Sequence, residues 1–319
     1  MAVTTAPTTT REARARRPRY TKMQRREHRA AYLFISPWIV GFLIFTLGAA
    51  IFSLVLSFSD YNLATGVIKP VGTANFQELF ADPKVFQSLS NTLFYAVLAV
   101  PGEMIVALVL ALLLNSIRRF AGIFRVLYYL PKMTPTVATA AIFLILLNGN
   151  EGAVNKFLAF LGITGPQWLI APGWVVVSIV IMTVWGVGGT MVIMLAALKN
   201  VPQDLYEASA IDGAGPVRQF FRITLPMISG ALFFNLIVLT VSALQIFDQV
   251  YLLFYQNASS AAPANSLFIA VYLFQQAFQQ FNLGFAAAIA WVLFVIIMVI
   301  TIIQVKWGNR FVYYEGDRD

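Results

Sequence analysis

Side chains able to do chemistry are few in this chain, and several of them stand inside apolar segments. The 319-residue sequence contains no cysteine and a single histidine, His28, which lies in a polar N-terminal stretch. This composition excludes disulfides, thiolate metal sites and cysteine nucleophiles, and it excludes histidine chemistry deep in the chain. We therefore predict no catalytic residue and no metal site. The candidates that remain are carboxylates, amides, one lysine and aromatic rings within apolar runs.

Two opposite charges, Glu103 and Lys132, fall inside such runs. A charge at the centre of a bilayer costs roughly 2.5–3.5 kcal/mol on insertion scales, so each needs a partner or a function. Counting along each helix at about 1.5 Å per residue places the two at similar depths. We predict an ion pair between them, which serves either to hold helices together or to line a pathway.

A polar stripe follows further along the chain, at Gln245, Asp248 and Gln249. On a continuous helix the spacing i, i+3 and i+4 puts all three on one face. Amide and carboxylate groups can hydrogen-bond the hydroxyls of a polar solute. Three aromatic residues could offer ring faces to its CH groups: Trp185, Phe247 and Tyr251. We predict that these residues line the pathway of a polar solute; the alternative is a polar seam against a partner protein.

Membrane-spanning helices must position these residues. The chain is 59% hydrophobic and 11% charged, which is too apolar for a soluble domain. A helix needs roughly 20 apolar residues to cross the hydrocarbon core, where the backbone has no water to bond. We predict an all-α polytopic membrane protein with six transmembrane helices, at residues 32–58, 91–115, 124–148, 173–198, 227–255 and 284–306.

Basic residues predict the orientation of these helices. Nine of them lie in a tail at residues 1–31, which we expect to be largely disordered. Others lie in the connection after the second helix, in a loop at residues 199–226 and in a C-terminal tail at residues 307–319, whereas residues 256–283 carry no charge. Both termini and the 199–226 loop are therefore predicted to be cytoplasmic, flanking a transmembrane domain at residues 32–306. The net charge of +8 reflects this topology and not nucleic-acid binding.

The 199–226 loop is itself predicted to fold. Pro202 and Asp204 are typical of a helix start, and the helix should run over residues 203–211. Glycines then break it, Pro216 starts a second short helix, and Pro226 ends that helix. The result is a compact knob of two short helices. It either docks in a groove of a partner or folds against the chain's own helix ends.

Seven positions of the knob resemble a known family: Glu207, Ala208, Ser209, Gly213, Ile223, Leu225 and Pro226. Their residue types and spacing match the loop that marks membrane subunits of binding-protein-dependent ABC importers, with serine in place of the second alanine. The N-terminal "SPWIVGFLIF" is similar to the first permease subunit of the carbohydrate-uptake branch, the type of the maltose and glycerol-3-phosphate importers. The family's Thr-Gly-Gly-Gly-Pro turn after the fifth helix is replaced here by "FYQNASSAAPANS".

This resemblance implies that the knob is a coupling helix seated in a cytoplasmic ATPase. Glu207 would be its anchoring carboxylate and Gly213 its turn, with Asp212 beside them. It also implies a second homologous permease, two ATPase subunits, an extracytoplasmic solute-binding protein, and a place in the bacterial cytoplasmic membrane among its lipids. ATP and Mg would be bound by the ATPase, because this chain has no Gly-x-x-x-x-Gly-Lys-Ser/Thr loop. The "GVGGT" at residues 186–190 is better explained by close helix packing.

The sequence therefore predicts a transport subunit and not an enzyme. It would form half of an alternating-access pathway for a di- or oligosaccharide. One alternative is a glycerol-3-phosphate permease, although a phosphate favours several convergent cations and only Lys132 is available. The other is an ion-coupled secondary transporter, which the scarcity of titratable groups in the helices and the lack of an internal repeat disfavour.

Overall fold

The computed structural model describes residues 22–62, 66–117, 119–255 and 262–308. The chain divides into two compact units, residues 1–53 and 54–319. The predicted tails at residues 1–21 and 309–319 lie outside the described residues.

The first unit is helical throughout its described part. It contains α1 (Lys22–Gly41), a π-helical stretch η1 (Phe42–Gly48) and the start of α2 (Ala49–Ser57). Because α1 begins at Lys22, the last part of the predicted disordered tail is helical; its arginines, glutamate and glutamine are good helix formers. The run Arg26–Ser57 is long and apolar enough to cross a membrane.

The second unit opens with a small hairpin that the all-α prediction did not include. Strands β1 (Ser59–Asn62) and β2 (Val67–Pro70) pair antiparallel. Helix α3 (Ala74–Ala81) leads into α4 (Pro83–Ser116). Helix α4 starts eight residues ahead of the predicted 91, because Asp82 caps it through the backbone N–H of Lys84 at 2.8 Å and proline suits its first turn.

The third predicted helix is not straight. It consists of α5 (Ala121–Met133) and α6 (Thr136–Leu146), which meet at a bend of 95°. The break is at Thr134, which is extended because Pro135 follows it. The prediction of one continuous helix over residues 124–148 is therefore wrong in this respect.

The fourth predicted helix is also bent, by 50°, between α8 (Trp174–Trp185) and α9 (Gly188–Lys199). The short helix α7 (Ala153–Phe160) precedes it. After α9 come the helices of the polar loop: α10 (Gln203–Ile211), α11 (Pro216–Gln219), the π-helical η2 (Phe220–Thr224) and α12 (Leu225–Met227).

The remaining chain holds the fifth and sixth predicted helices. The fifth is divided into α13 (Ser229–Leu244) and α14 (Asp248–Phe254). The 3-10 turn η3 (Ala264–Ser266), α15 (Ile269–Phe274) and π-helical η4 (Gln275–Gln279) lead to the sixth, α16 (Leu283–Gly308). Within the described residues, four helices could span a membrane, or six if each bent pair counts as one span. The cytoplasmic placement of the termini stays an expectation.

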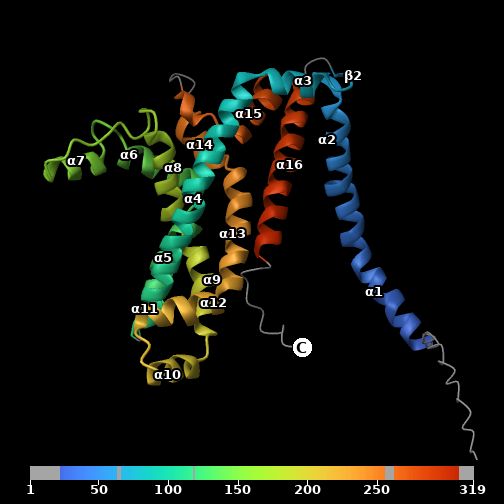
Figure 1. Cartoon of the computed structure of the whole chain (residues 1–319). Coiled ribbons are helices and arrows are strands. Elements are labelled where there is room, and N and C mark those ends of the chain that lie inside the picture. The colour runs from blue at the N-terminus through green and yellow to red at the C-terminus, as the bar shows by residue number, and fades with distance from the viewer. Residues whose placement is uncertain (1–21, 63–65, 118, 256–261, 309–319) are drawn as a thin grey trace, which may run out of the picture. The chain divides into compact units, whose positions relative to one another are not determined.

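Helix α4 lies at the centre of the second unit. It packs against α8, α9, α13 and α15, while α16 packs against α13, α15, α3 and β1. The elements α3, α7 and α15 lie at one end of this unit, and α10 and α11 lie at the opposite end (Figure 1). These loops thus lie at two opposite ends of the unit, while which end is cytoplasmic stays a prediction.

Helices α5 and α9 approach each other closely at Gly188. A Cβ atom there would lie 2.3 Å from the carbonyl oxygen of Tyr128 and 2.7 Å from Cα of Tyr129. Only glycine allows such an approach between two backbones. The predicted role of "GVGGT" in helix packing is thus supported at this glycine.

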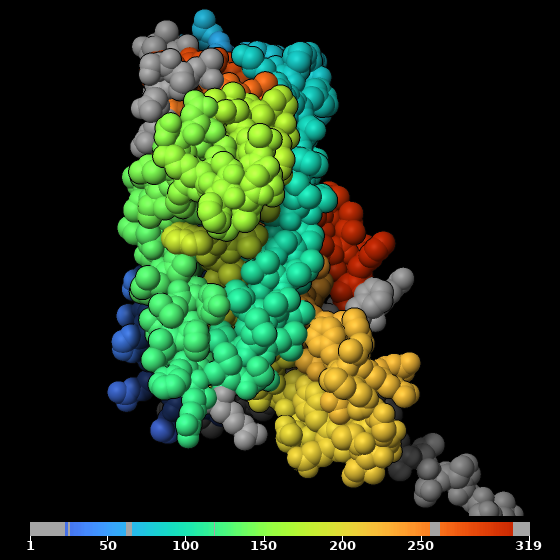
Figure 2. All heavy atoms as spheres, turned by 90° about the vertical axis from the view of Figure 1, so that its left-hand side faces the viewer, coloured from blue at the N-terminus to red at the C-terminus, as the bar shows by residue number. Residues whose placement is uncertain are grey.

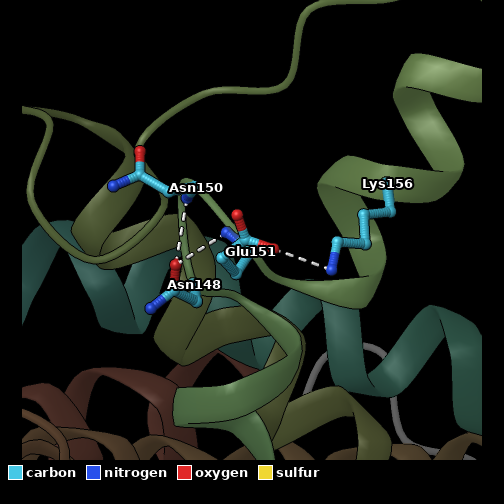
Figure 3. Close-up of polar contacts among 4 residues, drawn as sticks. All are labelled: Asn148, Asn150, Glu151 and Lys156. Atoms are coloured by element: carbon cyan, nitrogen blue, oxygen red, sulfur yellow. Dashed lines mark hydrogen bonds and ion pairs between the residues drawn. The ribbon is translucent and has the colours of Figure 1, made fainter.

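The turn between α6 and α7 is held by its own side chains (Figure 3). The Oδ1 atom of Asn148 accepts hydrogen bonds from the backbone N–H groups of Asn150 and Glu151, each at 3.0 Å. The carboxylate of Glu151 forms an ion pair of 2.8 Å with Lys156. Hydrogen bonding and charge from Lys156 lower the pKa of Glu151. Both side chains are exposed, so this pair orders a surface turn and adds little stability.

Candidate functional site

A polar cavity of about 410 Å³ lies among the helices of the second unit. Its walls come from α4, α5, α8, α9, α13 and α14. Its polar lining includes Glu103, Lys132, Thr183, Thr190, Asn235, Ser242, Gln245, Asp248 and Gln249. Such a set of amides, hydroxyls and carboxylates among apolar residues suits a hydroxylated solute.

A smaller cavity of about 130 Å³ adjoins this one and shares Glu103, Lys132, Thr183 and Gln249 with it. Its lining also includes Trp185 and three threonines at and after the bend, Thr134, Thr136 and Thr139. The face of the molecule that α4, α5, α6 and α7 form is hollowed between these helices (Figure 2). A larger cavity of about 560 Å³, between α13 and α16, has a largely apolar lining and offers little to a hydroxylated solute.

Glu103 is buried, and its carboxylate accepts a hydrogen bond of 2.8 Å from the hydroxyl of Thr190. This bond joins α4 to α9. A second polar contact of 2.8 Å, between the hydroxyls of Tyr95 and Thr183, joins α4 to α8. Both bent halves of the fourth span are therefore tied to α4 through polar groups at the cavity wall.

Glu103 and Lys132 do not form the direct ion pair that was predicted, although the two charges are close enough to interact. Within the described residues the one ion pair is that of Glu151 and Lys156. Glu103 faces Thr190 instead, and Lys132 is an exposed residue in the last turn of α5, beside the 95° bend. Glu103 and Lys132 both line the two polar cavities. The sequence therefore placed them at similar depths correctly but did not predict which atoms they contact.

Gln245, Asp248 and Gln249 all line the larger polar cavity, as the sequence predicted. The sequence analysis expected these three residues to lie on one continuous helix, and this expectation is wrong. Helix α13 ends at Leu244, and Phe247 has dihedrals outside the helical region, so Gln245 lies in a break between two helices. The break turns the side chains of both segments toward one cavity.

The three predicted aromatic residues have different surroundings. Trp185 lines the smaller cavity and packs edge to face against Phe143. Tyr251 lines neither polar cavity; it lies between the rings of Phe247 and Tyr255. Phe247, in contrast, lines the larger cavity.

Four lining residues escaped the sequence analysis: Thr183, Thr190, Asn235 and Ser242. Thr183 and Thr190 are seven residues apart, and so are Asn235 and Ser242. Seven residues are close to two helical turns, which puts Asn235 and Ser242 near one face of α13, whereas Thr183 and Thr190 lie on either side of the bend between α8 and α9. That spacing of polar residues in apolar segments was the signal available.

The knob at the opposite end of the unit is folded as predicted in its first half. Helix α10 ends in a left-handed turn at Gly213, whose φ is 76°. The N–H of Ala214 bonds to the carbonyl of Ser209, and the N–H of Gly213 bonds to that of Ala210. These are the two hydrogen bonds of a Schellman motif, in which glycine avoids the strain of a side chain at positive φ.

Side chains hold the two halves of the knob together. The amide of Gln219 donates to the hydroxyl of Ser209 at 3.0 Å and to the carbonyl of Tyr206 at 3.2 Å. The hydroxyls of Tyr206 and Thr224 are 2.9 Å apart. Ser209, the one departure from the resembled motif, thus supplies a hydrogen-bond acceptor that alanine would lack.

The end of the knob differs from the prediction at Pro226. The helical run does not stop there: it passes from α11 through η2 into α12 and reaches Met227. Proline is tolerated because it occupies the first turn of α12, and in the preceding π-helix each N–H reaches one residue further back. Leu225 and Pro226 line the apolar cavity beside α16, and Ile223 is half-buried.

The outward side of α10 is free within the described residues. Glu207, Ala208 and Asp212 are exposed, and the side chain of Ile211 is 87% exposed. No residue of α10 is buried. An exposed apolar side chain beside a carboxylate, on a helix fixed by its own hydrogen bonds, favours docking over folding against the chain's own helix ends.

Comparison with known proteins places this geometry in context. Residues 103–311 match the family model described as "Binding-protein-dependent transport system inner membrane component". The matched segment contains both the polar cavity, apart from Tyr95, Ala99 and Val100, and the whole knob.

Two curated relatives match this chain over most of its length and most of their own. The chain is 39% identical over 298 residues to the probable ABC transporter permease protein YesP of Bacillus subtilis, covering 92% of this chain and 95% of that protein. It is 34% identical over 279 residues to the lactose transport system permease protein LacF of Rhizobium radiobacter, covering 86% and 92%. Its fold is similar to a chain of a bacterial ABC transporter that imports the acidic polysaccharide alginate, with a TM-score of 0.78, 23% identity, and coverage of 90% and 98%.

Proposed function

Because the chain belongs to the family of binding-protein-dependent transport system inner membrane components, we propose that it is the permease subunit that forms half of an alternating-access pathway for a sugar. The observation that carries this proposal is the polar cavity of about 410 Å³ inside the spanning helices. The chain is a multi-pass protein of the cytoplasmic membrane. Its polar cavity holds the amides, hydroxyls and carboxylates that can bond a hydroxylated solute.

The chemistry of the lining favours a di- or oligosaccharide. Gln245, Gln249 and Asn235 carry amides that both donate and accept, and Asp248 accepts from hydroxyls. Lys132 is the one cation among the described residues that line the two polar cavities. A phosphate is bound better by several converging cations, which makes glycerol-3-phosphate the weaker alternative. The relative named for lactose transport supports the same choice.

Energy reaches this cavity through the knob. We propose that the α10 helix docks in a cleft of a cytoplasmic ATPase, with Glu207 as its anchor and Gly213 as the turn that shapes it. Ala208, Ser209 and Asp212 would lie at the contact, while Ile223, Leu225 and Pro226 would join the knob to α13. Mg and ATP would be bound by the ATPase. This chain would then contribute no catalytic group.

Coupling follows from the connections between the two sites. The knob leads directly into α13, which lines the polar cavity, and α9 enters the knob at its other end. When two ATPase subunits close on ATP, movement of the knob would shift α9 and α13 together against α4. The breaks at Thr134, Gly186 and Gln245 are the points where the cavity walls can bend.

Three further partners complete the proposed complex. A second homologous permease would form the other half of the pathway, a second ATPase would bind its knob, and an extracytoplasmic solute-binding protein would deliver the sugar. Lipid would cover the remaining apolar faces.

A pull-down from membranes in gentle detergent tests this proposal. We expect tagged wild-type protein to carry ATPase, a second permease and a binding protein. The Glu207→Ala variant should carry less ATPase per second permease, because only the ATPase bound to the partner's knob remains. The variant Glu151→Gln, changed at a distant exposed carboxylate, should retain all three. A wild-type chain that is isolated alone, or with copies of itself, would overturn the proposal.

A further inference from the structure

A further pocket, of about 360 Å³, lies at the outer end of α4. It is lined by Lys84 and Gln87 of α4, Tyr255 after α14, Gln275 of η4, and residues of the 262–267 segment. The larger polar cavity already described lies further along α4, where residues from Tyr95 to Glu103 line it. No part of the function proposed above uses this outer pocket.

The outer pocket is held in shape by hydrogen bonds. Gln87 and Asn91 of α4 donate to the carbonyl of Ala264, each at 3.2 Å, and Asn91 also donates to the carbonyl of Leu267. The hydroxyl of Ser266, which is fully buried, donates to the hydroxyl of Tyr255 at 3.2 Å. The 264–267 segment is therefore fixed to α4, and the ring of Tyr255 is fixed to that segment.

Neighbouring contacts hold α15 in place behind the pocket. The hydroxyl of Tyr272 donates to the carboxylate of Asp82 and accepts a hydrogen bond of 2.9 Å from Gln276. Burial and the hydrogen bond to Asp82 raise the pKa of Tyr272. The backbone N–H of Ile269 donates to Thr92 at 3.0 Å. Both walls of the pocket are thus attached to the same helix, α4.

A column of aromatic rings connects the outer pocket to the polar cavity. Phe247 and Tyr255 flank α14 at its two ends and Tyr251 lies within it, so the three are spaced i, i+4 and i+8 along the chain. The centroids of the first two rings are 5.3 Å apart and those of the second two 6.4 Å apart, and neighbouring rings are inclined by 24° and 14°. Phe247 lines the polar cavity and Tyr255 lines the outer pocket, so one column joins them over about 12 Å of helix.

The column is closed from the side by Phe274 of α15. Its ring centroid lies 5.1 Å from that of Phe247 and 5.1 Å from that of Tyr251. The middle ring is therefore covered, while the two end rings belong to the two pockets. Separation of α15 from α14 would uncover the whole column.

We propose that the outer pocket is a second subsite for one ring of an oligosaccharide, and that the Phe247–Tyr251–Tyr255 column leads from it to the polar cavity. An aromatic ring can cover the CH face of a sugar, which removes apolar area from water. The amides of Gln87 and Gln275 can bond its hydroxyls. Lys84 is the single cation among the described lining residues, which is too few for a phosphate. This inference rests on the sugar transport proposed above.

Chain length gives the proposal a distinct consequence. A sugar long enough to touch both pockets should depend on Tyr255, and one that fits the polar cavity alone should not. The test uses the complex of this chain with its partner subunits in proteoliposomes. Uptake of galacto- and arabino-oligosaccharides is measured from the disaccharide upward.

We expect Tyr255→Ala to raise KM about three- to tenfold for the longer sugars, the effect of losing one aromatic contact, and to leave that of the disaccharide unchanged. Tyr255→Phe keeps the ring and should behave as the wild type. Phe278→Ala is the matched control, because that ring packs on Phe274 and lines neither pocket. Equal KM values for Tyr255→Ala and wild type at every length would overturn the proposal and leave sugar transport standing.

If the Tyr255→Ala variant does not assemble into the complex, a labelling experiment can still test whether an oligosaccharide occupies the outer pocket. The chain has no cysteine, so Gln275→Cys introduces a single thiol in the outer pocket. We expect the longer oligosaccharides to slow its reaction with a maleimide. Protection by the sugar-free binding protein, with none from sugar, would overturn the proposal and mark the pocket as a protein-docking surface. A wild-type complex that transports no sugar of either series would instead contradict the proposed function.

Discussion

The hydroxyl of Thr190 on α9 donates a hydrogen bond of 2.8 Å to the carboxylate of Glu103 on α4, and both residues are buried. This one contact satisfies the only acidic side chain found buried among the described residues. It also connects the wall of the polar cavity to the helix that leads into the knob.

Removal of the Thr190 hydroxyl should destabilise the protein. Thr190→Val leaves the buried carboxylate without its donor, which we expect to lower the free energy of unfolding by about 1–3 kcal/mol. Thermal unfolding of the detergent-solubilised protein measures this change. Thr190→Ser keeps the donor and should unfold near the wild-type temperature. Indistinguishable unfolding of the valine and serine variants would contradict the assigned hydrogen bond.

Glu103 and Lys132 should be only weakly coupled, because their charges interact without a direct ion pair. In a double-mutant cycle with Glu103→Gln and Lys132→Met, we expect a coupling free energy within about 0.5 kcal/mol of zero. Unfolding midpoints of the four proteins supply the cycle. A coupling well above that value would restore the ion pair that the sequence alone had predicted.

Two adjacent glycines of the bent fourth span should respond differently to alanine. At Gly188 the new Cβ would lie 2.3 Å from a backbone oxygen of α5, which cannot move cheaply, so Gly188→Ala should reduce the yield and stability of the folded protein. At Gly189 the nearest atoms are side-chain carbons of Lys132 at 3.9 Å, an ordinary contact. Size-exclusion profiles and thermal unfolding compare the two variants. Equal tolerance would show that α5 and α9 are not so close.

The knob contains a similar matched pair. Gly213 has a φ of 76°, where a side chain costs about 1 kcal/mol or more, whereas Gly215 has a φ of −72° and open space around it. We expect Gly213→Ala to weaken recovery of the ATPase in the pull-down and Gly215→Ala to leave it unchanged. Loss of the ATPase with both variants would mean that the turn at Gly213 is not what matters.

Much of this architecture could be predicted from the sequence because its signals are local. Apolar length predicted the spanning segments, and Pro202, Asp204 and Gly213 predicted α10 and its end. Pro135 was a visible signal for the 95° bend, but the apolar run around it favoured a continuous helix. The break at Gln245 contains neither glycine nor proline, and α14 beyond it packs against α6, which is distant in sequence. No local pattern reports that contact.

The predicted ion pair failed for a different reason. Counting residues along a helix gives depth in the membrane but not the direction in which a side chain points. Glu103 and Lys132 have compatible depths and line the same cavities, yet Glu103 points toward Thr190. The aromatic column was missed in the same way, since its closure by Phe274 joins segments that are distant in sequence.

The central claim is that ATP, acting through the α10 knob, drives a sugar through the polar cavity. The most direct measurement is uptake by proteoliposomes that contain the whole complex. The substrate is the sugar that the binding protein binds, and ionophores collapse all ion gradients. We predict uptake that requires ATP, survives loss of the gradients, and falls to background in Glu207→Ala while Glu151→Gln remains active. Uptake that continues without ATP and stops when the gradients are collapsed would contradict the account.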